Sequence, residues 1–124
     1  MILYDLQDYK EEKRIDIIRQ LATKYGLVEK ELVWDKSEIY GKGLVYGFTQ
    51  ADINVFDWCL RLNTKNSFVE IIYELVINNG KICAYKYKNL SDIETIDKQL
   101  DFLIKKRKQL LQQIKFNQIN EDFK

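Results

Sequence analysis

Two acidic residues are the side chains of this sequence best placed to do chemistry. Asp57 and Glu74 lie in two segments whose apolar residues alternate with polar ones, and the register that aligns the apolar residues sets these carboxylates opposite each other. Carboxylates that close cannot both ionise freely, so the pKa of one should rise. Such pairs serve glycosidases and acid proteases, or hold a divalent metal with further ligands. The sequence offers no third ligand beside them, so we expect both acids to face water without a catalytic role.

A basic run near the C-terminus is the second candidate, because its residues could contact phosphate. Four consecutive residues of a helix point in all directions around it, so the run forms no single stripe. Bases in the second half of a helix also stabilise its dipole, which is a competing explanation. Nucleic-acid binding is therefore the alternative function. Its expected residues are Lys86, Lys88, Lys105, Lys106, Arg107 and Lys108.

A surface rich in tyrosine and aliphatic side chains is the third candidate, and it gives the leading hypothesis. The chain has eight tyrosines, and tyrosine is enriched in the cores of protein interfaces. If helices cover only one face of the sheet, the other face exposes an apolar patch of the kind that binds partners. The competing explanation is that the N-terminal helix or the segment 28–40 covers that face. The expected partner-binding residues are Ile72, Glu74, Tyr85 and Tyr87 on the sheet, and Leu111, Ile114 and Phe116 near the end of the C-terminal helix.

Composition excludes several chemistries. The sequence contains no histidine, which removes the usual general base, the hydrolase triads and most zinc sites. Cys59 and Cys83 have no metal-binding spacing and are expected to be buried thiols of a reducing compartment. We therefore expect a protein that is not an enzyme and that holds no cofactor and no metal.

Length and charge predict one globular domain over residues 1–124. The chain is 46% hydrophobic and 31% charged, with 20 basic and 19 acidic residues, which is an ordinary globular composition. No signal peptide and no apolar run long enough to span a membrane is found in the sequence. A cytoplasmic location without membrane association is expected.

A β-hairpin centred on Asn79-Gly80 organises the predicted fold. Asn-Gly is the preferred pair for a two-residue type I′ turn, and Phe68–Lys88 supplies β-branched and aromatic residues on both sides of it. A four-residue loop at 64–67 sets Arg61 opposite Glu70 and gathers one apolar face, called the core face below. Its pairs across this loop are Leu62 with Val69, Leu60 with Ile71, Trp58 with Tyr73, and Phe56 with Leu75.

The segments before the hairpin are predicted less sharply. Residues 5–25 should form a helix that starts with a capping box at Asp8 and Glu11 and ends at Gly26. Segment 28–40 is expected to be a short helix or an irregular connection. Residues 44–48 and 53–63 are expected to be strands, with a helix from residue 50 as the alternative for the second segment.

Residues 20–27 are similar to the opening of a helix-turn-helix motif, with a small residue and a turn glycine four positions apart. A recognition helix should present Arg, Asn or Gln to the base edges. The following segment instead carries Glu29 and Glu31. We therefore expect the plain end of a helix.

The last segment, from Ser91 to about Gln118, is predicted to be a long helix that begins with a capping box at Ser91 and Glu94. Acidic residues crowd its first half and basic residues its second, which suits the helix dipole. At about 40 Å it is longer than the strands, so its last turns should extend past the sheet and need a cover. That cover is the N-terminal helix, a second copy in a homodimer, or another protein.

The predicted fold is α+β, with an N-terminal helix, an antiparallel meander of three to four strands, and a long C-terminal helix packed on the core face. The expected function is non-catalytic binding of a macromolecular partner, in the first place a protein. Abundant Ile, Lys and Asn are typical of AT-rich genomes, which favours an inhibitor, immunity or regulatory protein of a phage or mobile element.

Overall fold

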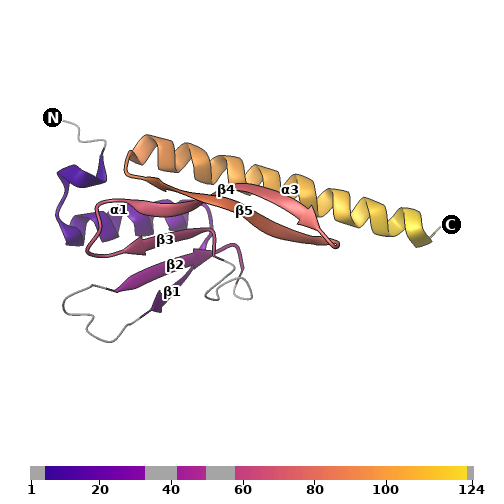
Figure 1. The fold of residues 1–124 in the computed structure, drawn as a ribbon, viewed down its shortest axis with the longest axis horizontal. Coiled ribbons are helices and arrows are strands. Elements are labelled where there is room, and N and C mark those ends of the chain that lie inside the picture. The colour runs from indigo at the N-terminus through magenta and orange to yellow at the C-terminus, as the bar shows by residue number, and fades with distance from the viewer. Residues whose placement is uncertain (1–4, 33–41, 50–57, 123–124) are drawn as a thin grey trace.

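The computed structural model describes residues 5–32, 42–49 and 58–122, and it confirms the α+β class (Figure 1). The described sheet has five strands, not three to four. In chain order the elements are a short 3-10 helix Leu6–Asp8, α1 Glu11–Lys24, β1 Val28–Leu32, β2 Gly43–Gly47, β3 Leu60–Asn63, β4 Val69–Asn78, β5 Lys81–Leu90 and α3 Ile93–Asp122.

The strands form an antiparallel meander in the order β1-β2-β3-β4-β5. The additional strand is β1, where a short helix or irregular connection was expected, so that prediction is wrong for residues 28–32. Three of the five residues of β1 are charged, which hides the strand in the sequence. Its ladder with β2, from Val28–Gly47 to Leu32–Gly43, holds it in place. Residues 33–40 of the same prediction lie outside the described residues.

The predicted register around the two central loops is confirmed. Leu62 pairs with Val69 and Leu60 with Ile71. Between them, Arg61 and Glu70 form an ion pair with 2.6 Å between Nη2 and Oε1. The β4–β5 turn also has the expected type I′ conformation, because Asn79 and Gly80 have φ values of 53° and 76°.

The predicted pairing of Trp58 with Tyr73 on the core face is wrong. Regular pairing of β3 begins at Leu60, and the chain bends at Cys59, which is buried in the main core. The bend turns Trp58 to the face of the sheet opposite the core face, where it packs with Val45 and stacks on Tyr87. Tyr73 is exposed. Phe56, the next residue of the expected core face, lies outside the described residues.

The N-terminal helix begins six residues later than predicted. Asp8 belongs to the 3-10 helix that Asp5 caps, with 2.9 Å from its Oδ1 to the backbone nitrogen of Gln7. Tyr9 and Lys10 are extended and separate this turn from α1, whose N-cap is Lys10. Backbone pairing ties the segment to the start of α3 through a hydrogen bond from the Leu6 N–H to the Ser91 carbonyl. Gly26 has the predicted left-handed conformation, with φ of 67°.

The long C-terminal helix is confirmed, with two corrections at its ends. Its cap is Asp92, not Ser91, because Asp92 accepts a 2.8 Å hydrogen bond from the Thr95 backbone N–H. The Ser91 hydroxyl instead lies 3.2 Å from Asp5 Oδ2. The helix ends at Asp122, beyond the expected Gln118, so its 30 residues span about 45 Å.

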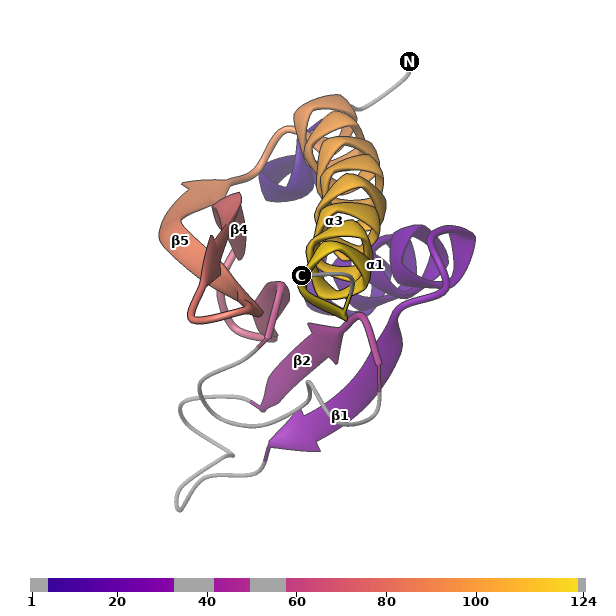
Figure 2. The same ribbon diagram turned by 90° about the vertical axis from the view of Figure 1, so that its right-hand side faces the viewer.

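Both helices pack against the core face. Figure 2 shows the sheet curving around α3, with α1 on the far side of α3 from β4 and β5. The main core gathers Leu6, Ile18, Ala22, Leu44, Tyr46, Cys59, Leu60, Leu62, Val69, Ile71, Ile72, Leu75, Ile96, Leu100, Leu103 and Leu110. The β4–β5 hairpin and α3 continue together past the three shorter strands (Figure 1). No helix within the described part of the chain is long and apolar enough to cross a membrane.

Candidate partner-binding surface

Three tyrosines and two lysines on β4 and the edge strand β5 form the candidate site, called the tyrosine–lysine surface below; Tyr85 and Tyr87 alternate with Lys86 and Lys88 along β5, so this surface wraps around the edge of the sheet. Its members are Tyr73, Tyr85, Lys86, Tyr87 and Lys88. Tyr73, Tyr85 and Tyr87 are 51%, 50% and 42% exposed. The ammonium of Lys86 lies 5.2 Å from the ring centroid of Tyr85, and that of Lys88 lies 4.7 Å from the ring of Tyr73. Each contact is a cation–π pair, so cationic charge and exposed aromatic surface occur together.

An unusual backbone conformation lies at the centre of this surface. Lys86 has φ of 60°, a left-handed conformation that costs a non-glycine residue about 1 kcal/mol. The β4–β5 ladder breaks there, at Tyr73 and Lys86. Gln99 of α3 covers the break, since its Nε2 donates to the carbonyls of Ile72 and Tyr73 at 2.8 and 3.0 Å. An interrupted edge pairs poorly with an added strand, so this edge offers a partner its side chains.

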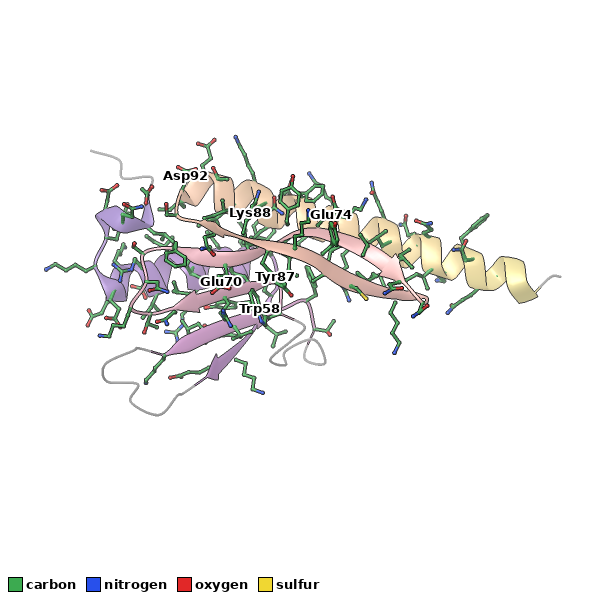
Figure 3. The ribbon with its side chains drawn as sticks, in the orientation of Figure 1. Trp58, Glu70, Glu74, Tyr87, Lys88 and Asp92 are labelled. Carbon is green, nitrogen blue, oxygen red and sulfur yellow. The ribbon has the colours of Figure 1, made fainter. Side chains whose placement is uncertain are left out.

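Tyr87 is held by a stack beneath it (Figure 3). Its ring centroid lies 4.5 Å from that of the buried Trp58, with 41° between the ring planes. The guanidinium of Arg61 lies 4.8 Å from the Trp58 ring and bonds Glu70. A fixed aromatic side chain loses little conformational entropy when it binds a partner. The sequence predicts the exposed tyrosine but misses this support, because the alternating pattern assigns Trp58 to the core face.

Glu74 lies directly opposite Tyr85, as the sequence predicts. Its Oε1 lies 4.0 Å from Nζ of Lys106 on α3, so a cation partly neutralises this carboxylate. Asp57, its expected partner in an acid pair, lies outside the described residues. Among the residues that the structure describes, no group of three or more His, Cys, Asp or Glu side chains could hold a metal ion.

The seven expected partner-binding residues do not form one surface. Ile72 is only 3% exposed and belongs to the main core, so its side chain is closed to a partner. Leu111 and Phe116 are exposed, as predicted, but they belong to α3 and not to the sheet. Ile114 is half-buried and lines a hollow of about 360 Å³ beside Gly80 of the hairpin turn.

The basic run of α3 is dispersed around the helix, as predicted. Lys105 bonds Asp101 at 2.8 Å and Lys106 faces Glu74. The Arg107 guanidinium lies 5.2 Å from the ring of Phe48, on the apolar side of the helix. Lys108 is exposed.

Charge is segregated along the molecule, which the near-zero total conceals. Residues 73–90 and 102–119, called the distal arm below, carry eight basic residues and one acidic residue, Glu74, while Glu70, Asp101, Glu121 and Asp122 lie just outside these bounds. Counting charge by segment would have revealed this from the sequence. The basic residues are Lys81, Lys86, Lys88, Lys105, Lys106, Arg107, Lys108 and Lys115.

Other titratable groups with shifted pKa values support the fold between α1, β1 and α3. Burial raises the pKa of Tyr46, whose hydroxyl donates to Glu29 at 2.6 Å. Burial alone would raise the pKa of Glu29, but hydrogen bonds from Arg19 and Tyr46 hold it below its usual value. The Tyr25 hydroxyl likewise lowers the pKa of Asp97.

Comparisons of the chain with protein-family models, with curated proteins and with solved structures found no match. Evidence on function therefore comes from the surface itself. That surface combines exposed aromatic rings and cations on an interrupted edge strand.

Proposed function

We propose that this protein is a non-catalytic binding protein that holds a partner protein on its tyrosine–lysine surface. The observation that carries the proposal is the exposure of three tyrosines, two of them paired with lysines. Tyrosine is among the residues that contribute most to protein interfaces. Lys86 and Lys88 would attract carboxylates of the partner, while the tyrosine rings would supply the apolar contact area.

The state of the aromatic rings favours a protein partner over a nucleic acid. Bases bind by stacking on open ring faces. Here, the ammonium groups of Lys86 and Lys88 lie over Tyr85 and Tyr73, and Tyr87 stacks on Trp58. Rings engaged in this way still offer their edges and hydroxyl groups to a protein.

Nucleic-acid binding is the second candidate, and the charge of the distal arm favours it. Eight basic residues against one acidic residue would attract phosphate and make the affinity fall steeply with salt. The residues that would contact phosphate are Lys86, Lys88, Lys105, Lys106, Arg107 and Lys108. Reversing the charge of Lys105, Lys106 and Lys108 should then abolish a gel shift of DNA or RNA.

The size of the chain and the lack of histidine in its sequence suit the biological role expected from the sequence. We propose that role as an inhibitor, immunity or regulatory protein of a phage or mobile element. Its target would present acidic side chains around an apolar contact, to match the lysines and tyrosines of the surface.

A pull-down with three baits tests the proposal. The baits are the wild type, a Lys86→Glu/Lys88→Glu variant, and a Lys10→Glu/Lys13→Glu control with the same charge change at the start of α1. Lysates of the source cells are treated with nuclease before capture, and mass spectrometry identifies the bound proteins. The proposal expects one protein that the wild type and the control retain and the β5 variant loses. Capture that disappears with nuclease would support the second candidate, and identical capture by all three baits would contradict both.

A further inference from the structure

A hollow between α1 and the start of α3, called the helix-pair hollow below, lies apart from the tyrosine–lysine surface. It has a volume of about 400 Å³, which is within the range of ligand pockets. The extended segment before α1, one side of α1 and the first residue of α3 all contribute to it. Its lining residues are Tyr9, Lys13, Ile17, Gln20, Leu21, Lys24 and Ile93.

The floor of the helix-pair hollow is apolar and partly open to solvent. Ile17, Leu21 and Ile93 are half-buried and pack on the main core. Ile17 and Leu21 are four positions apart, so they follow one side of α1 along its axis. Lys13 and Lys24 lie at the two ends of this side, about 16 Å apart along the helix. The hollow is therefore elongated, with an apolar floor and a lysine at each end.

The two lysines differ in their ion pairs. Lys24 is neutralised, because its Nζ lies 3.0 Å from Oδ1 of Asp97 on α3. The Tyr25 hydroxyl donates to the same carboxylate and compensates its charge further. Lys13, in contrast, forms no ion pair with any other residue that the structure describes. Only the Lys13 end of the hollow therefore offers an unpaired cation to a ligand.

Three contacts hold the walls of the hollow in place. Arg14 fixes the extended segment, because its Nη1 donates to the Tyr9 carbonyl at 2.7 Å. The Leu6 N–H donates to the Ser91 carbonyl and ties this segment to the chain just before α3. The ion pair of Lys24 joins the end of α1 to α3, and Figure 2 shows the two helices beside each other. A pocket that is already formed loses little conformational entropy when it binds a ligand.

We propose that the helix-pair hollow binds a medium-chain fatty acid, with the carboxylate at Lys13 and the unbranched chain along the apolar floor. Charge complementarity favours an anion and sets its direction, because the cation at the other end is already paired. The elongated floor favours a linear chain. From Lys13 to Leu21 the helix rises about 12 Å, which is the length of a chain of about ten carbons. Decanoate is therefore the probe.

The proposal does not rest on the proposed function, because no residue of the tyrosine–lysine surface lines the hollow. Lys86→Glu/Lys88→Glu should bind decanoate like the wild type, although it loses the partner protein in the pull-down. Failure of decanoate binding would leave the pull-down result intact, and the reverse is also true.

Isothermal titration calorimetry of the full chain with decanoate, below the concentration at which micelles form, tests the site. The wild type should bind one decanoate molecule. Lys13→Glu should weaken binding by about tenfold, because the attraction of an exposed ion pair becomes a repulsion. Lys13 is exposed, so this variant should keep the fold. Lys10→Glu is the matched control, since Lys10 is exposed, lies one turn earlier and does not line the hollow. It should bind like the wild type.

A series of chain lengths tests the apolar floor. Affinity should rise by up to about fourfold for each methylene added between hexanoate and decanoate. It should level off beyond dodecanoate, because the chain then extends past the hollow.

Three results would overturn the proposal. The first is a wild type that does not bind decanoate at about 1 mM. The second is equal affinity of Lys13→Glu and Lys10→Glu, which would show that the carboxylate does not bind at Lys13. The third is an affinity that keeps rising past dodecanoate, which would show adsorption of the chain outside the hollow.

Discussion

The stack of Tyr87 on Trp58 predicts that the two tyrosines of β5 have different roles in stability. Tyr87→Ala removes a ring whose centroid lies 4.5 Å from that of Trp58 and uncovers the buried indole. Such an aromatic pair is worth about 1 kcal/mol beyond area burial, and the lost burial adds about 1 kcal/mol. Tyr85→Ala removes a half-exposed ring whose pair with Lys86 is worth about 0.5 kcal/mol.

Urea denaturation followed by far-UV circular dichroism measures both changes in the free energy of unfolding. The expected losses are about 2 kcal/mol for Tyr87→Ala and about 0.5 kcal/mol for Tyr85→Ala. In thermal unfolding, a chain of this size should lose about 4 °C per kcal/mol. A double-mutant cycle with Trp58→Leu should give a coupling of about 1 kcal/mol to Tyr87 and none to Tyr85.

Equal losses for the two tyrosine variants, or zero coupling between Trp58 and Tyr87, would refute the assignment of Tyr87 to a supporting stack. The difference in stability loss between Tyr87→Ala and Tyr85→Ala also decides which of these variants is a suitable probe of binding. A double Tyr85→Ala/Tyr87→Ala variant would lower the free energy of unfolding through Tyr87 as well as remove contact surface. Tyr85→Ala alone removes a contact surface with little effect on the fold.

Two further predictions concern the support of the fold. Gly26→Ala should lower the free energy of unfolding, measured by urea denaturation, by about 1 kcal/mol. Gly26 has φ of 67° and an added Cβ meets no atom within 4 Å, so the loss comes from backbone strain alone. An unchanged free energy of unfolding would contradict the left-handed C-terminal cap of α1. The pKa values of Glu29 and Asp97 are lowered in the fold, so their stabilisation is complete above the ordinary carboxyl pKa of about 4 and is lost as pH falls through the lower folded values. The urea midpoint of the wild type should therefore fall as the pH is lowered from about 6 to about 3. The midpoint of a Glu29→Gln/Asp97→Asn variant should fall less over the same pH range. Parallel plots of urea midpoint against pH for the two proteins would contradict this prediction.

The central hairpin and its register could be predicted because several signals coincide there. Asn79-Gly80 specifies the turn, and Leu60, Leu62, Val69 and Ile71 all fall on one face only in the observed register. The start of α3 could be predicted to within one residue, since Ser91 and Asp92 are both good caps and only the geometry chooses between them.

The missed features arise where tertiary contacts override the local pattern. Strand β1 has no apolar alternation of its own and forms because β2 offers it a partner. Trp58 follows the alternation of β3 in the sequence, but the bend at Cys59 sends it to the other face. The left-handed conformation of Lys86 gives no signal in the sequence, although it lies at the centre of the candidate surface.

The measurement that tests the central claim most directly is the amount of partner protein captured by Tyr85→Ala compared with the wild type, after nuclease treatment. Tyr85 is half exposed and contacts Lys86, so its loss should leave the fold intact. If the tyrosine–lysine surface binds a protein, capture of one specific protein should fall by more than about tenfold, as for a residue at the centre of an interface. Undiminished capture of that protein by Tyr85→Ala would show that the partner binds elsewhere and would contradict the proposed function.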